Sequence, residues 1–301
     1  MTDITTGEKD FERFRKSGLV AGGSRAIGAM FVRARTALAH GLVRLGVRPN
    51  HISVAGFVIT LFAAACFVAG AGHHAPYEGP VPGVSQSLWP LAAALFLLLA
   101  GACDMLDGAV ARQGNSGTPF GGVLDSTLDR LSDIAIYLGM AIHFAYYGNV
   151  TYTVLAVAAM CNGYMISYVK ARAEDLIDDC SVGYWLRGER CGGLLLACLC
   201  FHVPAWLWLQ ATAPLGTVAR RLWHAYRELQ GGSHASRRAA GERSGLLRAI
   251  RHGDTPRGSI AYDVVTGAAI AFFVFAPWAS PFFYGGTDPL RAGLSRLMPA
   301  G

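Results

Sequence analysis

Four aspartates with helical spacing are the residues of this sequence best suited to chemistry. Asp104 and Asp107 are three residues apart, and Asp125 and Asp129 are four apart, so each pair shares one face of a helix. The polar stretch at 113–119 is short enough to make the two helices antiparallel neighbours, which would bring the four carboxylates together. Mutually repelling anions need cations, and hard oxygen ligands select Mg²⁺, Mn²⁺ or Ca²⁺. The spacing therefore predicts a site for divalent ions.

Small residues and one arginine surround these carboxylates. Gly108 directly follows the second aspartate, and Gly121 stands one turn before the third, so both leave room for a ligand to come close. Ala111 leaves space on the next turn, and Arg112 can offer two parallel hydrogen bonds to phosphate oxygens. Paired divalent ions commonly stabilise the entering and leaving oxygens of a transferring phosphoryl group. The cluster therefore predicts phosphoryl-transfer chemistry.

The composition places these aspartates among membrane helices. Of 301 residues, 52% are hydrophobic and only 15% are charged, whereas soluble domains carry about 25% charged residues. Long charge-free stretches supply the roughly 20 apolar residues that a spanning helix needs. Carboxylates in such surroundings are costly unless they are paired or metal-bound. We predict an all-α, polytopic membrane helix bundle with spans near 51–72, 87–110, 120–142, 149–171, 188–204, 206–227 and 260–283.

The distribution of Lys and Arg predicts the orientation of this bundle. Basic residues gather before the first span, beside Arg112, at 170–190 and at 220–257, which indicates that these segments and the aspartates face the cytoplasm. The C-terminal tail would lie outside. The formal net charge of +6 follows from topology, and no nucleic-acid partner is expected. The stretch at 191–219 holds two crossings only if the sixth span continues through Arg220 and Arg221.

Two further segments flank the spans. Apolar residues recur at helical spacing over 26–45 with arginines among them, which predicts an amphipathic helix lying on the membrane surface or packed on the rest of the protein. Residues 231–258 are rich in Gly, Ser and Arg, which predicts a flexible linker with a short helix at 242–251. The predicted organisation is an N-terminal segment at 1–50, a membrane domain at 51–229, a basic cytoplasmic linker at 230–259, and an additional transmembrane helix with its tail at 260–301.

The aspartates, glycines and arginine together resemble the signature of a known family, the CDP-alcohol phosphatidyltransferases. The matching residues are Asp104-x-x-Asp107-Gly108-x-x-Ala111-Arg112 and, after eight intervening residues, Gly121-x-x-x-Asp125-x-x-x-Asp129. The resemblance implies a six-span core over residues 30–229, with the amphipathic helix included. It also implies transfer of a phosphatidyl group from a CDP-linked lipid, CDP-diacylglycerol, to an alcohol, with release of CMP.

The resemblance also implies a role for each residue of the signature. Asp129 would contribute to metal binding and act as general base on the incoming hydroxyl, a contribution of roughly 10²–10⁴ in rate. Two ions of Mg²⁺ or Mn²⁺ would be held by the four aspartates Asp104, Asp107, Asp125 and Asp129. The CMP and diphosphate would lie against Pro49, Asn50, Gly108, Ala111, Arg112 and Gly121.

A second cationic cluster bears on the acceptor. The run SYVKARAE at 167–174 with a later RGER at 187–190 resembles the subgroup that makes phosphatidylinositol phosphate or archaetidylinositol phosphate. In that subgroup, cations corresponding to Lys170, Arg190 and Arg221 would bind the phosphate of inositol phosphate. Converging cations predict a phosphorylated acceptor, because an uncharged one would leave them unpaired. The alternative is that these cations only obey the positive-inside rule.

Other functions remain open at this stage. Glycerol 3-phosphate could be the acceptor, which would make the protein a phosphatidylglycerophosphate synthase. An intramembrane prenyltransferase also uses Asp-rich pairs and Mg²⁺, and a cation transporter would use the carboxylates as an ion path, although transporter sites tend toward the midplane. The expected setting is a bacterial cell membrane with the active site facing the cytoplasm, and the resemblance implies a homodimer.

Overall fold

The computed structural model describes residues 23–230 and 260–297, and every regular element within these ranges is a helix. The all-α prediction is therefore confirmed. The predicted linker at 231–258 and its short helix at 242–251 lie outside the described residues. In chain order the elements are α2 Gly23–Arg44, α3 Pro49–Gly70, α4 Trp89–Gln113, α5 Pro119–Tyr146, α6 Val150–Glu174, α7 Arg187–Leu199, α8 Val203–Thr212, α9 Pro214–Leu229, α12 Ile260–Ala279, the 3₁₀ helix η1 Pro281–Tyr284 and α13 Pro289–Leu297.

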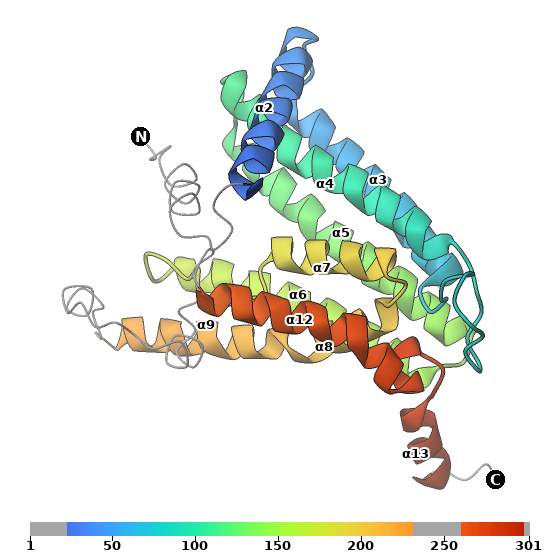
Figure 1. Ribbon diagram of the computed structural model, residues 1–301. Coiled ribbons are helices and arrows are strands. Elements are labelled where there is room, and N and C mark those ends of the chain that lie inside the picture. The colour runs from blue at the N-terminus through green and yellow to red at the C-terminus, as the bar shows by residue number, and fades with distance from the viewer. Residues whose placement is uncertain (1–22, 231–259, 298–301) are drawn as a thin grey trace.

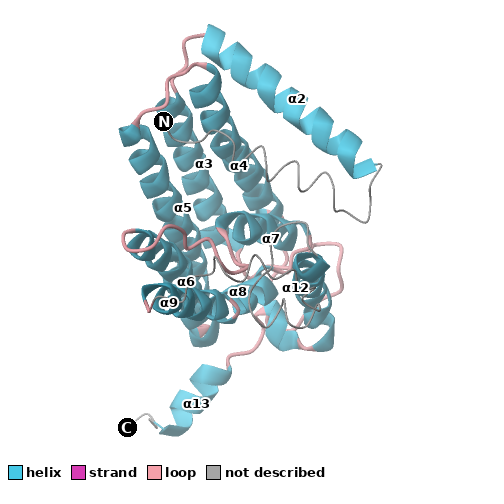
Figure 2. Cartoon of the chain, turned by 90° about the vertical axis from the view of Figure 1, so that its left-hand side faces the viewer, coloured by secondary structure: helices cyan, strands magenta, loops and turns pink. Residues whose placement is uncertain are grey.

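The helices form two groups that cross each other (Figure 1). Helices α3, α4 and α5 run together with α3 in the middle (Figure 2), and α6 to α9 with α12 form the second group, which α6 joins to α5. The sequence predicted that α4 and α5 would be direct neighbours, but each of them packs mainly along α3. Small residues explain this close approach, since a Cβ on Gly139 of α5 would lie only 2.5 Å from the Ala64 carbonyl oxygen of α3.

Within residues 23–230 and 260–297, four helical segments are long and apolar enough to cross a membrane: Pro49–Gly70, Trp89–Gln113, Val150–Glu174 and Tyr262–Ala279. Large apolar side chains are exposed on α3 and α4, among them Phe62, Leu95 and Leu98, as is typical of surfaces that face lipid. These features confirm a membrane helix bundle. The full count of six core spans and one additional span stays a prediction.

The structure differs from the sequence prediction at the fifth and sixth spans. Helix α7 has 13 residues, or about 20 Å, where the sequence predicted a helix over 188–204. The helix predicted at 206–227 is two helices, α8 and α9, which meet at Pro214. Proline has no N–H to donate within a helix, and Asn162 of α6 instead donates to the carbonyls of Gln210 and Ala211 at 3.3 and 2.8 Å.

Helix α2 confirms the helix predicted at 26–45. Its C-terminal half packs on α3 and α4 through a small apolar cluster in which Ala39 meets Ile52 and Val110. The Gln113 side chain at the end of α4 also donates to the Thr36 carbonyl at 3.2 Å. The helix is therefore packed on the bundle over this half, and its contact with a membrane surface stays a prediction.

The Asp288 carboxylate links the segment after α12 to the first turn of α6, alongside hydrogen bonds from Asn149 and Tyr152. Asp288 accepts hydrogen bonds from the backbone N–H groups of Val150 at 2.7 Å and Thr151 at 3.0 Å, and from the Thr151 hydroxyl at 2.6 Å. It also accepts from the Arg291 N–H at 3.1 Å, in the first turn of α13. Asp288 thus satisfies N–H groups that a helix start leaves without a partner in its own helix.

We expect Asp288→Ala to lower the free energy of unfolding by about 1–3 kcal/mol, measured as a lower melting temperature in detergent. Partial burial raises the pKa of Asp288, but the hydrogen bonds from Thr151, Arg291 and Val150 outweigh it, so this pKa lies below its ordinary value. The contribution of Asp288 to the free energy of unfolding is therefore complete above the ordinary carboxyl pKa of about 3.9. It is lost as the pH falls through the lowered pKa of Asp288. Between pH 5 and pH 8, about one to four units above that value, the difference between wild type and variant should stay constant.

The exposed Asp178 offers the matched control, because Asp178→Ala removes the same chemical group without removing a helix cap. An equal melting temperature for Asp288→Ala and wild type would contradict this role. It would mean that the other contacts suffice to hold the segment, among them the ring packing of Phe282 on Tyr152, with centroids 5.6 Å apart, and the hydrogen bonds from Asn149 to the Gly285 and Thr287 carbonyls.

Candidate active site

Three of the four predicted carboxylates come together, one from α4 and two from α5. Oxygens of Asp104, Asp125 and Asp129 all lie within 4.8 Å of one another. Asp125 and Asp129 share a face of α5 because they are four residues apart, and the short connection at 114–118 keeps the end of α4 near the start of α5. An oxygen-only donor set of this kind is what Mg²⁺ and Mn²⁺ prefer. The residues present therefore fit a divalent ion.

The fourth carboxylate, Asp107, faces α3 instead. Its side chain is buried, with 7% exposed. It accepts a hydrogen bond from the Ser53 hydroxyl at 2.7 Å and one from the Gly108 N–H at 2.5 Å. Asp107 still lies within the electrostatic range of Asp104 and Asp125. The structure thus gathers three predicted ligands and places the fourth beside them, where Ser53 orients it.

Arg187 at the start of α7 forms ion pairs with two residues of the carboxylate cluster. One of its terminal nitrogens lies 3.0 Å from an Asp104 oxygen and 2.8 Å from an Asp129 oxygen. Sequence reasoning did not place Arg187 in the site. The signal that could have found it is its spacing, because Arg187 stands three residues before Arg190 and so shares its helix face.

Two small residues of the signature, Gly108 and Gly121, lie close to polar side chains. A Cβ on Gly121 would lie 3.1 Å from the Asn50 side-chain oxygen, so the start of α3 and the start of α5 are in contact there. Thr118 begins α5 by accepting a hydrogen bond from the Gly121 N–H at 3.0 Å. A Cβ on Gly108 would lie 3.4 Å from a terminal nitrogen of Arg112, so the Arg112 guanidinium folds back over Gly108.

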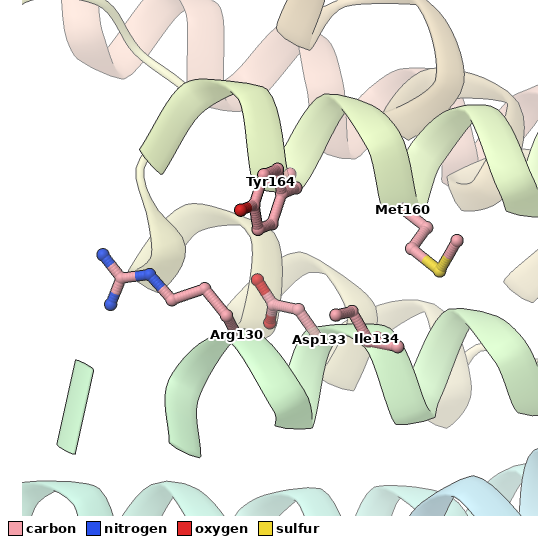
Figure 3. Close-up of a pocket in the computed structure, with 6 residues that line it drawn as sticks. Arg130, Asp133, Ile134, Met160 and Tyr164 are labelled. Carbon is pink, nitrogen blue, oxygen red and sulfur yellow. The ribbon is translucent and has the colours of Figure 1, made fainter. Parts of the chain in front are cut away.

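Arg190, the second cation of α7, is buried with 4% exposed. It forms an ion pair of 2.6 Å with Asp133 of α5 and donates to the Trp185 carbonyl at 3.2 Å. Figure 3 shows the Asp133 carboxylate directed from α5 toward α6, where a cavity of about 10 Å³ has room for one water molecule. Asp133 was also missed from the sequence, although it continues the four-residue spacing of Asp125 and Asp129.

Both arginines of α7 keep a donor available. Within the part of the chain that the structure describes, the Nε atoms of Arg187 and Arg190 are buried without a hydrogen-bond partner. A buried donor without a partner is costly, and it marks a position where an oxygen-rich ligand would be favourable. The donor of Arg187 lies next to the carboxylate cluster, because the same guanidinium contacts Asp104 and Asp129.

The remaining predicted acceptor residues lie in different surroundings. Lys170 is 40% exposed and pairs with Glu174 at 3.6 Å. Arg221 is 1% exposed, and its guanidinium donates to the Val182 carbonyl at 3.1 Å and to the Ile166 carbonyl. Arg221 thus joins α6 to the segment before α7, and it lies within the electrostatic range of Arg190. Convergence of all three cations on one phosphate stays a prediction.

Comparison with known proteins identifies the class. Residues 47–221 match the family described as CDP-alcohol phosphatidyltransferase. This match covers more than half of the chain, so the chain belongs to that family. The matched range includes every residue of the carboxylate cluster and both arginines of α7, and it ends before α12.

The sequence is similar to individual members of this family. The chain is 36% identical over 147 residues to archaetidylinositol phosphate synthase of Methanothermobacter thermautotrophicus, an alignment that covers 49% of this chain and 64% of the relative. It is 36% identical over 155 residues to phosphatidylinositol phosphate synthase of Mycobacterium tuberculosis, covering 48% and 60%. The chain thus spans less than two thirds of the length of these two relatives. It spans 90% of archaetidylinositol phosphate synthase of Pyrococcus horikoshii, at 32% identity and with 64% of this chain covered.

Solved structures agree with this fold. The crystal structure of Mycobacterium tuberculosis phosphatidylinositol phosphate synthase with CDP-DAG bound aligns with a TM-score of 0.53 and 27% identity, covering 64% of this chain and 94% of that one. The same enzyme in complex with manganese and citrate aligns with a TM-score of 0.53 and 28% identity, covering 64% and 88%.

Proposed function

We propose that this chain transfers a phosphatidyl group from CDP-diacylglycerol to a hydroxyl of inositol phosphate and releases CMP. The observation that carries the proposal is the gathering of Asp104, Asp125 and Asp129 within 4.8 Å in a member of the CDP-alcohol phosphatidyltransferase family. The structures of a relative with CDP-DAG and with manganese support the lipid donor and the metal for this chain too.

Asp104, Asp125 and Asp129, with Asp107 beside them, are the residues that would hold two ions of Mg²⁺ or Mn²⁺. When bound, such ions neutralise the charge that develops on the diphosphate as CMP departs. Ser53 prevents Asp107 from turning away, because its hydroxyl donates to that carboxylate at 2.7 Å. Helix α3 thus orients the Asp107 carboxylate through Ser53.

Asp129 is the proposed general base. A hydroxyl is a poor nucleophile near neutral pH, so a carboxylate within hydrogen-bond reach raises the rate. The acceptor O–H bond breaks and its proton passes to the Asp129 carboxylate, while the acceptor oxygen forms a bond to the phosphorus next to the diacylglycerol. The bond from that phosphorus to the oxygen of CMP breaks, and CMP leaves with the electron pair.

The nucleotide would lie where the starts of α3 and α5 meet. Gly121 and Asn50 are in contact there, and the absence of a side chain on Gly121 leaves backbone accessible to a phosphate or ribose. Arg112 supplies a guanidinium fork for the diphosphate. Pro49, Gly108 and Ala111 complete the proposed CDP-lipid site.

The acceptor phosphate would bind at Arg190, with Lys170 and Arg221 contributing charge. The buried Nε donor of Arg190 that has no partner in the described residues supports this assignment. The named activities of the relatives favour inositol phosphate over glycerol 3-phosphate. We place the site at the cytoplasmic face of a bacterial cell membrane and expect a homodimer.

The test is an acceptor screen with the purified chain, radiolabelled CDP-diacylglycerol and Mg²⁺. We expect a labelled phosphatidylinositol phosphate product with inositol phosphate, and at most a trace with free inositol. A product formed from glycerol 3-phosphate but not from inositol phosphate would reject the proposed acceptor and leave the reaction class in place.

A further inference from the structure

Helix α12 lies beyond the residues matched to the family, 47–221, yet it contacts the segment that carries the arginines of the site. The Tyr262 hydroxyl of α12 donates to a carboxylate oxygen of Glu189 at 2.9 Å. One turn further along, Thr266 accepts a hydrogen bond from the Tyr184 hydroxyl at 2.9 Å. Figure 1 shows α12 running beside α7 and α8, and these bonds join α12 to the first turn of α7 and to the segment just before it.

The contacts continue from α12 to Arg190. The Tyr184 and Tyr262 rings lie 5.2 Å apart, and Tyr184 meets Trp185 edge to face at 5.0 Å. The Trp185 carbonyl accepts a hydrogen bond from the Arg190 guanidinium at 3.2 Å. Helix α12 therefore contacts Tyr184, and the carbonyl of the next residue, Trp185, orients Arg190.

Helix α9 holds the same segment from another element. Thr217 accepts a hydrogen bond from the Trp185 N–H at 3.4 Å, and Arg221 donates to the Val182 carbonyl at 3.1 Å. Gly183 has φ +101°, and a Cβ there would collide with Thr217, so the segment takes a path that only glycine accommodates well. With one contact set from α9 and one from α12, the segment at 182–190 has little freedom to shift.

We infer that α12 positions Arg187 and Arg190 for the phosphorylated acceptor, with Tyr262 and Thr266 as the positioning residues. Glu189 lies between the two arginines in the first turn of α7, and its hydrogen bond to Tyr262 fixes the rotation of that turn. The arginines then face the carboxylates of α5, Asp129 and Asp133. This inference rests on the proposed function, because it assigns α12 to the acceptor half of the site.

The experiment compares Tyr262→Phe, Thr266→Val and the double variant with wild type, with CDP-diacylglycerol and inositol phosphate varied separately. Each single variant removes one hydroxyl and keeps the bulk of the side chain. We expect the KM for inositol phosphate to rise about 3–10-fold in the single variants, and further in the double variant. The kcat and the KM for CDP-diacylglycerol should stay within a factor of two of wild type, about 0.4 kcal/mol or less.

Tyr146→Phe is the matched control, because Tyr146 is 83% exposed and lies at the far end of α5 from Asp125 and Asp129. An unchanged KM for inositol phosphate in Tyr262→Phe and Thr266→Val, with an active wild type, would overturn the role of α12 and leave the proposed function in place. A parallel change in kcat and both KM values, with a lower melting temperature, would also overturn it, because it indicates a general structural role. A wild type that uses no phosphorylated acceptor would overturn the proposed function, and this inference with it.

Discussion

Asp129→Asn is expected to lower kcat for CMP release by a factor of about 10²–10⁴. The amide keeps the size of the side chain and removes its capacity to take a proton from the acceptor hydroxyl. Asp129 also lies within 4.8 Å of Asp104 and Asp125, so the same change removes one oxygen anion from the metal site. The measurement is CMP release from CDP-diacylglycerol at saturating acceptor and metal.

Binding of Mn²⁺ separates the two roles of Asp129. If Asp129→Asn still binds Mn²⁺ with an affinity close to that of wild type while kcat falls, the general base is the role lost. If Mn²⁺ binding falls in step with kcat, Asp129 acts chiefly as a ligand. Asp178→Asn, at an exposed position after α6, is the control, and full activity of Asp129→Asn would reject its place in the reaction.

Arg190→Ala carries the second large expected effect. Arg190 is 4% exposed and its ion pair with Asp133 is 2.6 Å long, so its removal leaves the Asp133 carboxylate buried without its cation. Breaking a buried pair in this way costs about 3–5 kcal/mol of stability. For protein that remains folded, we expect the KM for inositol phosphate to rise by about 10–150-fold, because a hydrogen bond between charged groups contributes about 1.5–3 kcal/mol.

Two further variants keep this prediction measurable. Asp133→Asn combined with Arg190→Ala removes the uncompensated charge, so it should recover much of the stability and none of the acceptor affinity. Arg172→Ala removes an arginine whose side chain is 64% exposed and should change neither quantity. Recovery of acceptor affinity in the double variant would mean that Arg190 acts only by keeping the fold intact.

The carboxylate cluster could be predicted from the sequence because helical spacing alone decides which residues share a face. The four-residue spacing is enough to predict that Asp125 and Asp129 share a helix face. The short connection at 114–118 predicts that Asp104 lies near them. Asp107 shows the limit of that reasoning. Its hydrogen-bond partner Ser53 is 54 residues away in the chain, and nothing in local spacing reveals that α3 would lie between α4 and α5.

The acceptor half of the site was less predictable for a related reason. The cations of 167–190 are visible in the sequence, but the partners of Arg187 and Arg190 come from other helices, as with Asp133 and Arg190. Pro214 is a recognisable helix breaker, but the hydrogen bonds that Asn162 of α6 donates to the carbonyls of Gln210 and Ala211 come from about 50 residues away in the chain. Contacts of α12 with Glu189 and Tyr184 join residues more than 70 positions apart, which only the tertiary structure shows.

The most direct test of the proposed reaction is the ratio of CMP released to phosphatidylinositol phosphate formed by the purified chain, measured with and without Mn²⁺. Metal-dependent phosphatidyl transfer predicts one CMP per lipid product in the presence of Mn²⁺ and inositol phosphate, with neither product formed after the metal is removed by chelation. CMP released without a matching lipid product, or product formed equally well in the chelated sample, would contradict the assignment of Asp104, Asp125 and Asp129 to a metal-dependent transfer.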